Sequence, residues 1–222
     1  KVADQKPVYA VVTNSTYDGL CYNAVRVQEL LEKSCDRIHF DEAWYGYARF
    51  NPIYEDHFAM RGDPANHRGA TVFATHSTHK LLAALSQSSY IHVRDGKGAI
   101  DHHRFNQAYQ MHTTTSPLYA IVASNDITSA MMDGSAGRSL TQEAIEEAVD
   151  FRQVVGRMWR EFTDKKEWFF KPWNAETIKN NGHKVAFEDA PAELLCHNQE
   201  PWVLRPGDKW HGFEDIADDW CM

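Results

Sequence analysis

The sequence predicts an α/β protein, and three features of the chain support this fold class. Apolar stretches rich in β-branched residues, at 7–15, 36–44 and 71–77, have the length and composition of buried strands. Residues 22–34, between the first two, repeat apolar side chains with a helical period. A long amphipathic segment at 139–162 predicts a further helix. The order strand, helix, strand indicates a parallel βαβ unit, followed after the long helix by a smaller α/β unit.

Polar residues stand where the first two predicted strands end. Thr13, Asn14 and Ser15 close the first strand, and Asp41 closes the second. Because the carboxyl ends of parallel strands meet at one edge of a sheet, where open α/β sheets bind ligands, this edge is a candidate site.

The middle of the chain is less regular. Residues 45–69 have no sustained period, and a long loop of this kind is usually retained for function. A further strand is expected at 88–96, a helix at 101–112 that stops at 113–117, and a second, buried helix over 118–132.

The segment 139–162 has the strongest helical pattern. Ser139 is the expected N-cap, and Gln142, three residues later, would complete a capping box. The composition changes around 134–138, so we expect a domain boundary that divides the chain into 1–136 and 137–222.

Composition restricts the possible partners. The net charge is -8, and 23 Lys and Arg are scattered among 31 Asp and Glu, which argues against a nucleic-acid binder. No apolar run reaches the roughly 20 residues that span a bilayer, and no signal-peptide pattern is present, so a cytoplasmic protein is expected. The 4 cysteines form no CxxC pair, so neither a zinc knuckle nor a disulfide framework is indicated.

Lys80 stands at a seam between a polar cluster, Ser77 to His79, and the apolar run that begins at Leu81. A lysine dehydrated there would be a nucleophilic amine, whereas the simpler alternative is a solvent-exposed lysine at the edge of a helix. Paired with Asp41, such a lysine suits pyridoxal phosphate, which needs an amine for its aldehyde and a carboxylate for its pyridine nitrogen. The hydroxyls of Ser77 and Thr78 could bind the phosphate, and His79 could donate a proton.

Two alternative hypotheses for the function remain. His76 with His79, or the stretch 101–103, could bind a metal in a hydrolase, although no third ligand is evident. A catalytically silent assembly relative would keep the fold without the chemistry. The presence of Asp41, His79 and Lys80 together argues against that second reading.

Several motifs in order resemble those of the inducible ornithine/lysine/arginine decarboxylases, which are fold type I, aspartate aminotransferase-like pyridoxal-phosphate enzymes. The resemblance covers essentially the whole chain and rests on DEAWYGYARFNPIY, STHKLLAALSQ, HTTTSPLY, DFRQ, WFFKPW and WHGF. It implies that 1–136 form the C-terminal half of the cofactor-binding large domain. Residues 137–222 would then be the linking helix and the start of the small α/β domain of a longer protein.

The resemblance also implies roles for individual residues. Lys80 would bind the cofactor covalently, Asp41 would pair with its ring nitrogen, and His79 would lie beside the reacting carbon. The other implied cofactor contacts are Ala43, Trp44, Ser77 and Thr114. Thr114 matches a position that reaches the phosphate in the neighbouring subunit, which implies a homodimer with a shared active site and, as in the family, a decamer of five dimers.

The implied substrate is a basic amino acid. The stretches ATHSTHKLL with His76, HRFNQAY and SLTQEAIEEAVDFRQ are most similar to acid-inducible family members that act on arginine. The expected reaction is therefore arginine to agmatine and CO2, with net consumption of a proton that would serve acid resistance. Lysine and ornithine remain alternative substrates.

Overall fold

The computed structural model describes residues 6–205, which fall into two compact units. The first unit comprises the residues before Asn51 together with 55–134, and the second comprises 51–54 together with the residues from Ser135 onward. The motif WHGF, at 210–213, lies outside the described residues.

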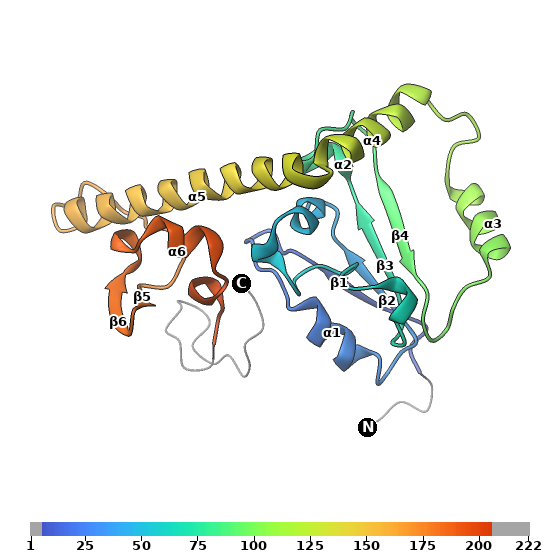
Figure 1. Ribbon diagram of the computed structural model, residues 1–222, viewed down its shortest axis with the longest axis horizontal. Coiled ribbons are helices and arrows are strands. Elements are labelled where there is room, and N and C mark those ends of the chain that lie inside the picture. The colour runs from blue at the N-terminus through green and yellow to red at the C-terminus, as the bar shows by residue number, and fades with distance from the viewer. Residues whose placement is uncertain (1–5, 206–222) are drawn as a thin grey trace. The chain divides into compact units, whose positions relative to one another are not determined.

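The first unit is built on a four-stranded sheet in the order β1-β2-β3-β4 (Figure 1). The strands are β1 (Ala10–Thr13), β2 (Arg37–Asp41), β3 (Thr71–His76) and β4 (Tyr90–Arg94). β1, β2 and β3 are parallel, and β4 pairs antiparallel with β3. Helix α1 (Ala24–Leu31) connects β1 to β2, which confirms the predicted βαβ unit.

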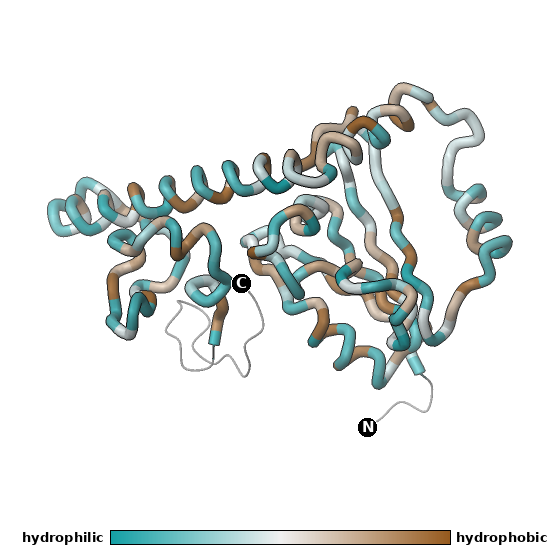
Figure 2. The backbone as a smooth tube through the Cα atoms, viewed as in Figure 1, coloured by the Kyte–Doolittle hydropathy of each residue, from teal (hydrophilic) through white to brown (hydrophobic). Residues whose placement is uncertain are grey.

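One face of this sheet carries the hydrophobic core. Side chains alternate between the faces of a strand, and β2 accordingly buries Ile38 and Phe40 but not their neighbours. Val72 and Ala74 of β3 join them, and α1 packs its buried residues against the same face. Figure 2 shows hydrophobic residues on the strands and alternating hydrophobic and hydrophilic residues along α1.

The segment 45–69, between β2 and β3 in the chain, contains three short 3-10 helices: η1 (Gly46–Phe50), η2 (Pro52–Tyr54) and η3 (Pro64–Asn66). It is more buried than a surface loop, because Tyr45, Ala48 and Ala59 are each at most 1% exposed.

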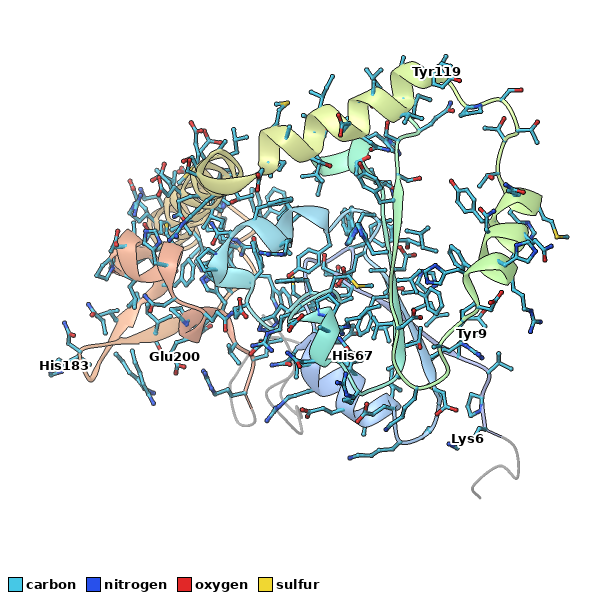
Figure 3. The ribbon with its side chains drawn as sticks, turned by 45° about the vertical axis from the view of Figure 1, so that its right-hand side comes forward. Lys6, Tyr9, His67, Tyr119, His183 and Glu200 are labelled. Atoms are coloured by element: carbon cyan, nitrogen blue, oxygen red, sulfur yellow. The ribbon has the colours of Figure 1, made fainter. Side chains whose placement is uncertain are left out.

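The helices after β3 were only partly predicted. The short α2 (Thr78–Leu81) precedes β4, and α3 (His102–His112) stops before the 113–117 stretch as expected. α4 (Tyr119–Met132) is a helix, but the prediction that it is buried was wrong for the described residues. The buried side chains of α4 include Ser124 and Thr128, whereas most of its apolar side chains are exposed. Tyr119 is 80% exposed and points away from the sheet (Figure 3).

The second unit contains the long helix α5 (Gly134–Phe162), the hairpin β5 (Thr177–Asn180) and β6 (His183–Ala186), and α6 (Ala192–His197). Two further 3-10 turns are η4 (Phe187–Asp189) and η5 (Glu200–Trp202). Its core joins α5 to the hairpin and to α6 through residues that include Val149, Ile178, Phe187 and Leu195. The turn of the hairpin lies at His183 in Figure 3.

The predicted capping box at Ser139 is wrong, because α5 begins five residues earlier, at Gly134. Gly134 has a φ of +64°, a conformation that glycine adopts without strain, and it separates α4 from α5 without a longer loop. Ser139 therefore lies inside the helix, where its backbone N–H does not need a capping partner.

Within residues 6–205, no helix is long and apolar enough to cross a membrane. Cys21, Cys35 and Cys196 are buried, and Cys221 lies outside the described residues.

Candidate active site

The carboxyl ends of β1, β2 and β3 meet at one edge of the sheet, as the sequence predicted. The backbone N–H of Asn14 donates to the carbonyl of Asp41 at 2.9 Å. The N–H of Ser77 donates to the carbonyl of Ala43 at 2.8 Å, so the pairing of β2 with β3 continues past the strands. Asp41 and the segment that carries Lys80 therefore leave the sheet at the same edge.

Asp41 lies on the sheet face opposite the core. Its Oδ1 accepts a hydrogen bond from the backbone N–H of Ala43 at 3.2 Å. His39 and Thr75, 3.3 Å apart between Nε2 and Oγ1, lie on the same face. Among the described residues no cationic side chain forms an ion pair with Asp41, so its charge is open to a ligand.

Lys80 is exposed, and its ammonium group has no hydrogen-bond or ion-pair partner in the described chain. The predicted buried wall beside it is absent from these residues, because Leu81 and Leu85 are 52% and 54% exposed. Helix α2 is a single turn that ends at Leu81. The exposed side chains of Leu81 and Leu85 do not cover Lys80, so they do not shield its ammonium group from water.

The residues just before Lys80 divide between the two faces of α2. Ser77 is the N-cap residue of α2, yet its hydroxyl makes no capping bond, so it is available to a phosphate. Thr78 is buried and donates from Oγ1 to Asn125 Oδ1 at 2.5 Å, so it is committed to the interior. Of the two hydroxyls proposed for the phosphate, only that of Ser77 fits. His79 is half-buried beside Lys80.

Ala43 and Trp44 follow Asp41 and Glu42 in the chain. The Trp44 indole N–H donates to the carbonyl of Ser15 at 3.0 Å, which links the ends of β2 and β1. The Trp44 ring also contacts Tyr17, with 4.9 Å between the ring centroids. These contacts place the indole beside Ala43 at the Asp41 edge.

Thr114 is not brought to this edge by contacts within the described residues. It lies in the connection between α3 and α4, where its Oγ1 accepts from the backbone N–H of Ser116 at 3.1 Å, and its side chain is exposed. Its expected role, in a neighbouring subunit, stays a prediction.

A buried polar network beneath the edge was not predicted from the sequence. Glu42, 1% exposed, points into the core side while Asp41 points out. Its Oε1 accepts from Asn14 Nδ2 and from the backbone N–H of Ala59, both at 2.8 Å. Its Oε2 lies 2.9 Å from Nε2 of His76. The signal that could have found it is the alternation of side chains along β2.

Two further histidines border this network. The ring of His92 lies 5.0 Å from the ring of His76, and the pKa of His92 is lowered, first because neighbouring atoms dehydrate its ring and second because of repulsion from His76. Burial also lowers the pKa of His57, although its Nδ1 lies near two backbone carbonyls that favour the protonated ring.

A cavity of about 290 Å³ opens on the core side of the network within the first unit. Its lining includes Glu42, His76, Tyr45, Phe58, Tyr90 and Met132. Lys80 and Asp41 are not among its lining residues, so this cavity is separate from the outward edge that carries them.

The described residues do not support the metal-site reading. Between residues 6 and 205 no group of three His, Cys, Asp or Glu side chains is placed to hold an ion. Asp101 instead caps α3, because its side chain accepts from the backbone N–H of Arg104 at 2.9 Å. His76 is bound to Glu42 on the core side.

The sequence matches a known protein family over its whole length. A family model described as "Orn/Lys/Arg decarboxylase, major domain" matches residues 1–222. The biodegradative arginine decarboxylase of Escherichia coli K12 is 66% identical over 222 residues, covering 99% of this chain and 29% of that protein. The lysine decarboxylase LdcA of Pseudomonas aeruginosa is 47% identical over 220 residues, covering 99% of this chain and 27% of that protein.

Solved structures agree with the sequence comparison. The structure of lysine decarboxylase A from Pseudomonas aeruginosa matches with a TM-score of 0.80 and 45% identity, over 99% of this chain and 27% of the other. The constitutive lysine decarboxylase of Escherichia coli matches with a TM-score of 0.73 and 40% identity, over 98% and 27%. This chain therefore spans less than a third of the length of these relatives.

Proposed function

Since the chain belongs to the Orn/Lys/Arg decarboxylase family, we propose that it supplies the lysine and the carboxylate of a pyridoxal-phosphate site that decarboxylates a basic amino acid. The observation that carries the proposal is that Asp41 and the Lys80 segment leave the sheet at one edge and that neither side chain forms an ion pair in the described chain. An unpaired amine and an unpaired carboxylate at the same edge match the two ends of this cofactor.

The residues present fit the cofactor. Lys80 would hold its aldehyde carbon, and Asp41 would pair with its protonated ring nitrogen. Ser77, whose hydroxyl is uncommitted, would donate to the phosphate. Ala43 would pack against the ring, and Trp44 would lie close by, held by its bond to Ser15.

Pyridoxal phosphate, when bound, supplies a conjugated ring that accepts the electrons released when the carboxylate leaves as CO2. Asp41 favours this transfer because its negative charge keeps the ring nitrogen protonated. His79 would hold a proton beside the Cα of the substrate, and Lys80 would supply the amine that binds the cofactor aldehyde. One proton is consumed for each CO2 formed.

Arginine is the substrate that the comparisons favour, because identity is 66% to an arginine decarboxylase and 47% and 43% to two lysine decarboxylases. The products would be agmatine and CO2, and the proton consumed would serve acid resistance in the cytoplasm. Lysine or ornithine is the alternative. The exposed Thr114 would complete the site of a partner subunit in a homodimer, five of which would form a decamer.

The test uses the longest natural protein that contains this chain. The protein is incubated with pyridoxal phosphate, reduced with borohydride and mapped by mass spectrometry, and product amines are measured with arginine, lysine and ornithine. We expect the pyridoxyl label on Lys80 and agmatine as the main product. Lys80→Ala should lose both, whereas Lys33→Ala, an exposed lysine elsewhere in the unit, should lose neither. A folded protein without label on Lys80 would overturn the proposal.

A further inference from the structure

We propose that Glu42 and His76 are positioning residues that fix the Ser77–Lys80 segment relative to Asp41, an inference that rests on the proposed function. The starting observation is that Glu42 holds three separate parts of the first unit at once. Asn14 follows β1, Ala59 lies in the segment 45–69, and His76 ends β3.

The chemistry of Glu42 makes this arrangement specific. The Nδ2 group of Asn14 and the backbone N–H of Ala59 can only donate, so Oε1 must be an acceptor. Nε2 of His76 lies 2.9 Å from Oε2, and this hydrogen bond fixes the orientation of the imidazole. The side chain of His76 is 14% exposed and that of Glu42 is 1% exposed, so water screens this contact poorly.

The segment after His76 has few other restraints. α2 is one turn long, its N-cap side chain makes no capping bond, and its C-cap residue, Leu82, is already extended. Besides the Glu42–His76 pair, two polar contacts tie the segment to other parts of the described unit, namely Ser77 N–H to the Ala43 carbonyl at 2.8 Å and the hydroxyl of Thr78 to Asn125 at 2.5 Å. Leu82 adds apolar packing on the cavity wall. The Lys80 ammonium group makes no polar contact in the described chain, and the backbone N–H of Lys80 donates only within the turn, to the Ser77 carbonyl at 3.1 Å.

The pair also connects the two halves of the site through the backbone. Glu42 is the residue after Asp41, and its N–H donates to the Thr75 carbonyl at 3.1 Å, next to His76. Asp41 and Glu42 point to opposite faces, so the core-side pair sets the position of the ends from which Asp41 and Lys80 project. Other polar groups around the pair are His92, Tyr90 and Arg49, all on the cavity wall.

The experiment compares His76→Ala, His76→Gln and Glu42→Gln in the full-length protein. The matched control is His67→Ala, because the His67 ring is also half-buried and hydrogen bonded, 2.6 Å from the Ala70 carbonyl, but lies before the start of β3 (Figure 3). Two quantities are measured: amide hydrogen exchange of the peptide containing 77–82, and the rate at which borohydride-stable pyridoxyl appears on Lys80.

We expect His76→Ala to speed exchange at 77–82 and to slow labelling of Lys80 about tenfold or more, because a misplaced amine reacts slowly. His76→Gln should keep most of the wild-type rate, since its amide can still donate to Glu42. Glu42→Gln combined with His76→Ala should be no slower than the slower single variant, because both remove one interaction. His67→Ala should leave both quantities unchanged.

If both His76→Ala and Glu42→Gln have the wild-type rate of Lys80 labelling and the wild-type rate of amide exchange at 77–82, the positioning role is wrong, whatever the thermal stability of the variants. Should His76→Ala not fold, the nearly isosteric Glu42→Gln carries the comparison, because it weakens the same contact without opening a cavity and should change exchange and labelling in the same direction. If Lys80 is never labelled even in the wild type, the proposed function is wrong. The positioning role still stands in that case if exchange at 77–82 is faster in His76→Ala than in the wild type.

Discussion

Asp41 lies directly opposite Thr75 in the parallel pairing of β2 with β3. This register places the carboxylate level with the end of the strand that continues, through His76 and Ser77, to Lys80. Two residues far apart in the chain are thereby presented at one sheet edge by the pairing of backbone groups. The first two predictions concern this edge.

Asp41→Asn should lower turnover by roughly 10²–10³-fold, because the neutral amide no longer stabilises a positive ring nitrogen as charge develops. The side chain keeps its shape and its acceptor oxygen for the Ala43 N–H, so cofactor attachment at Lys80 should be largely retained. Steady-state rates with arginine and mass spectrometry of the reduced protein measure the two quantities. Asp36→Asn, an exposed aspartate just before β2, is the control and should keep wild-type turnover.

His79→Gln should lower kcat by about 10²–10⁴-fold while Lys80 still binds the cofactor, because glutamine keeps a polar group but cannot give up a proton. The comparison variant is His102→Gln, at the exposed start of α3, for which kcat should not change. The kcat of both variants is measured with saturating cofactor. A His79→Gln protein with wild-type kcat would show that another group protonates the product.

The order of β1, α1, β2 and β3 and the location of Asp41 at a strand end were predictable, because the period of apolar residues and the parallel pairing are local signals. The Glu42–His76 contact was missed, since two acidic residues in a row after a strand suggest a solvated turn. Only the alternation of faces along β2 separates Asp41 from Glu42. The burial of α4 was mispredicted because an apolar pattern does not reveal which neighbours cover it.

The start of α5 shows a different reason for error. Ser139 and Gln142 match a capping box, but Gly134 permits a left-handed turn that starts the helix earlier, and sequence pattern alone does not rank the two. The assignment of individual cofactor contacts, including Thr114, came from family resemblance, because no local pattern shows which subunit a loop reaches.

The pH dependence of stability should reflect His57. Burial lowers its pKa in the folded protein below the unfolded value of about 6.5. Above that value both states are neutral and the group has no effect, whereas below it the unfolded chain binds a proton that the folded ring resists, so stability falls as pH drops. His57→Asn keeps a donor for the Cys21 and Tyr22 carbonyls but cannot titrate.

We therefore expect the free energy of unfolding of His57→Asn to decline less steeply than that of wild type between about pH 7 and pH 5. Denaturant titrations at several pH values measure it. Asn106→Gln, at an exposed position of α3, is the control, since it removes no titratable group and its slope should match the wild type. A wild-type slope for His57→Asn would show that His57 does not resist protonation.

Gln153, the last residue of the DFRQ motif, should be essential to the second unit. It is 7% exposed, and its Nε2 donates to the carbonyls of Phe187 and Ala190 at 3.2 and 2.8 Å, which ties α5 to the turn η4. Gln153→Leu keeps the volume but removes the side-chain donor to the Ala190 carbonyl and leaves the Phe187 carbonyl with only the Ala190 N–H, so we expect a loss of about 1–3 kcal/mol in the free energy of unfolding. Asp150→Asn, on the exposed side of the same helix, should change it by less than about 0.5 kcal/mol. Equilibrium unfolding monitored by tryptophan fluorescence compares the two variants, and equal stabilities would mean that packing alone, without these hydrogen bonds, fixes η4 against α5.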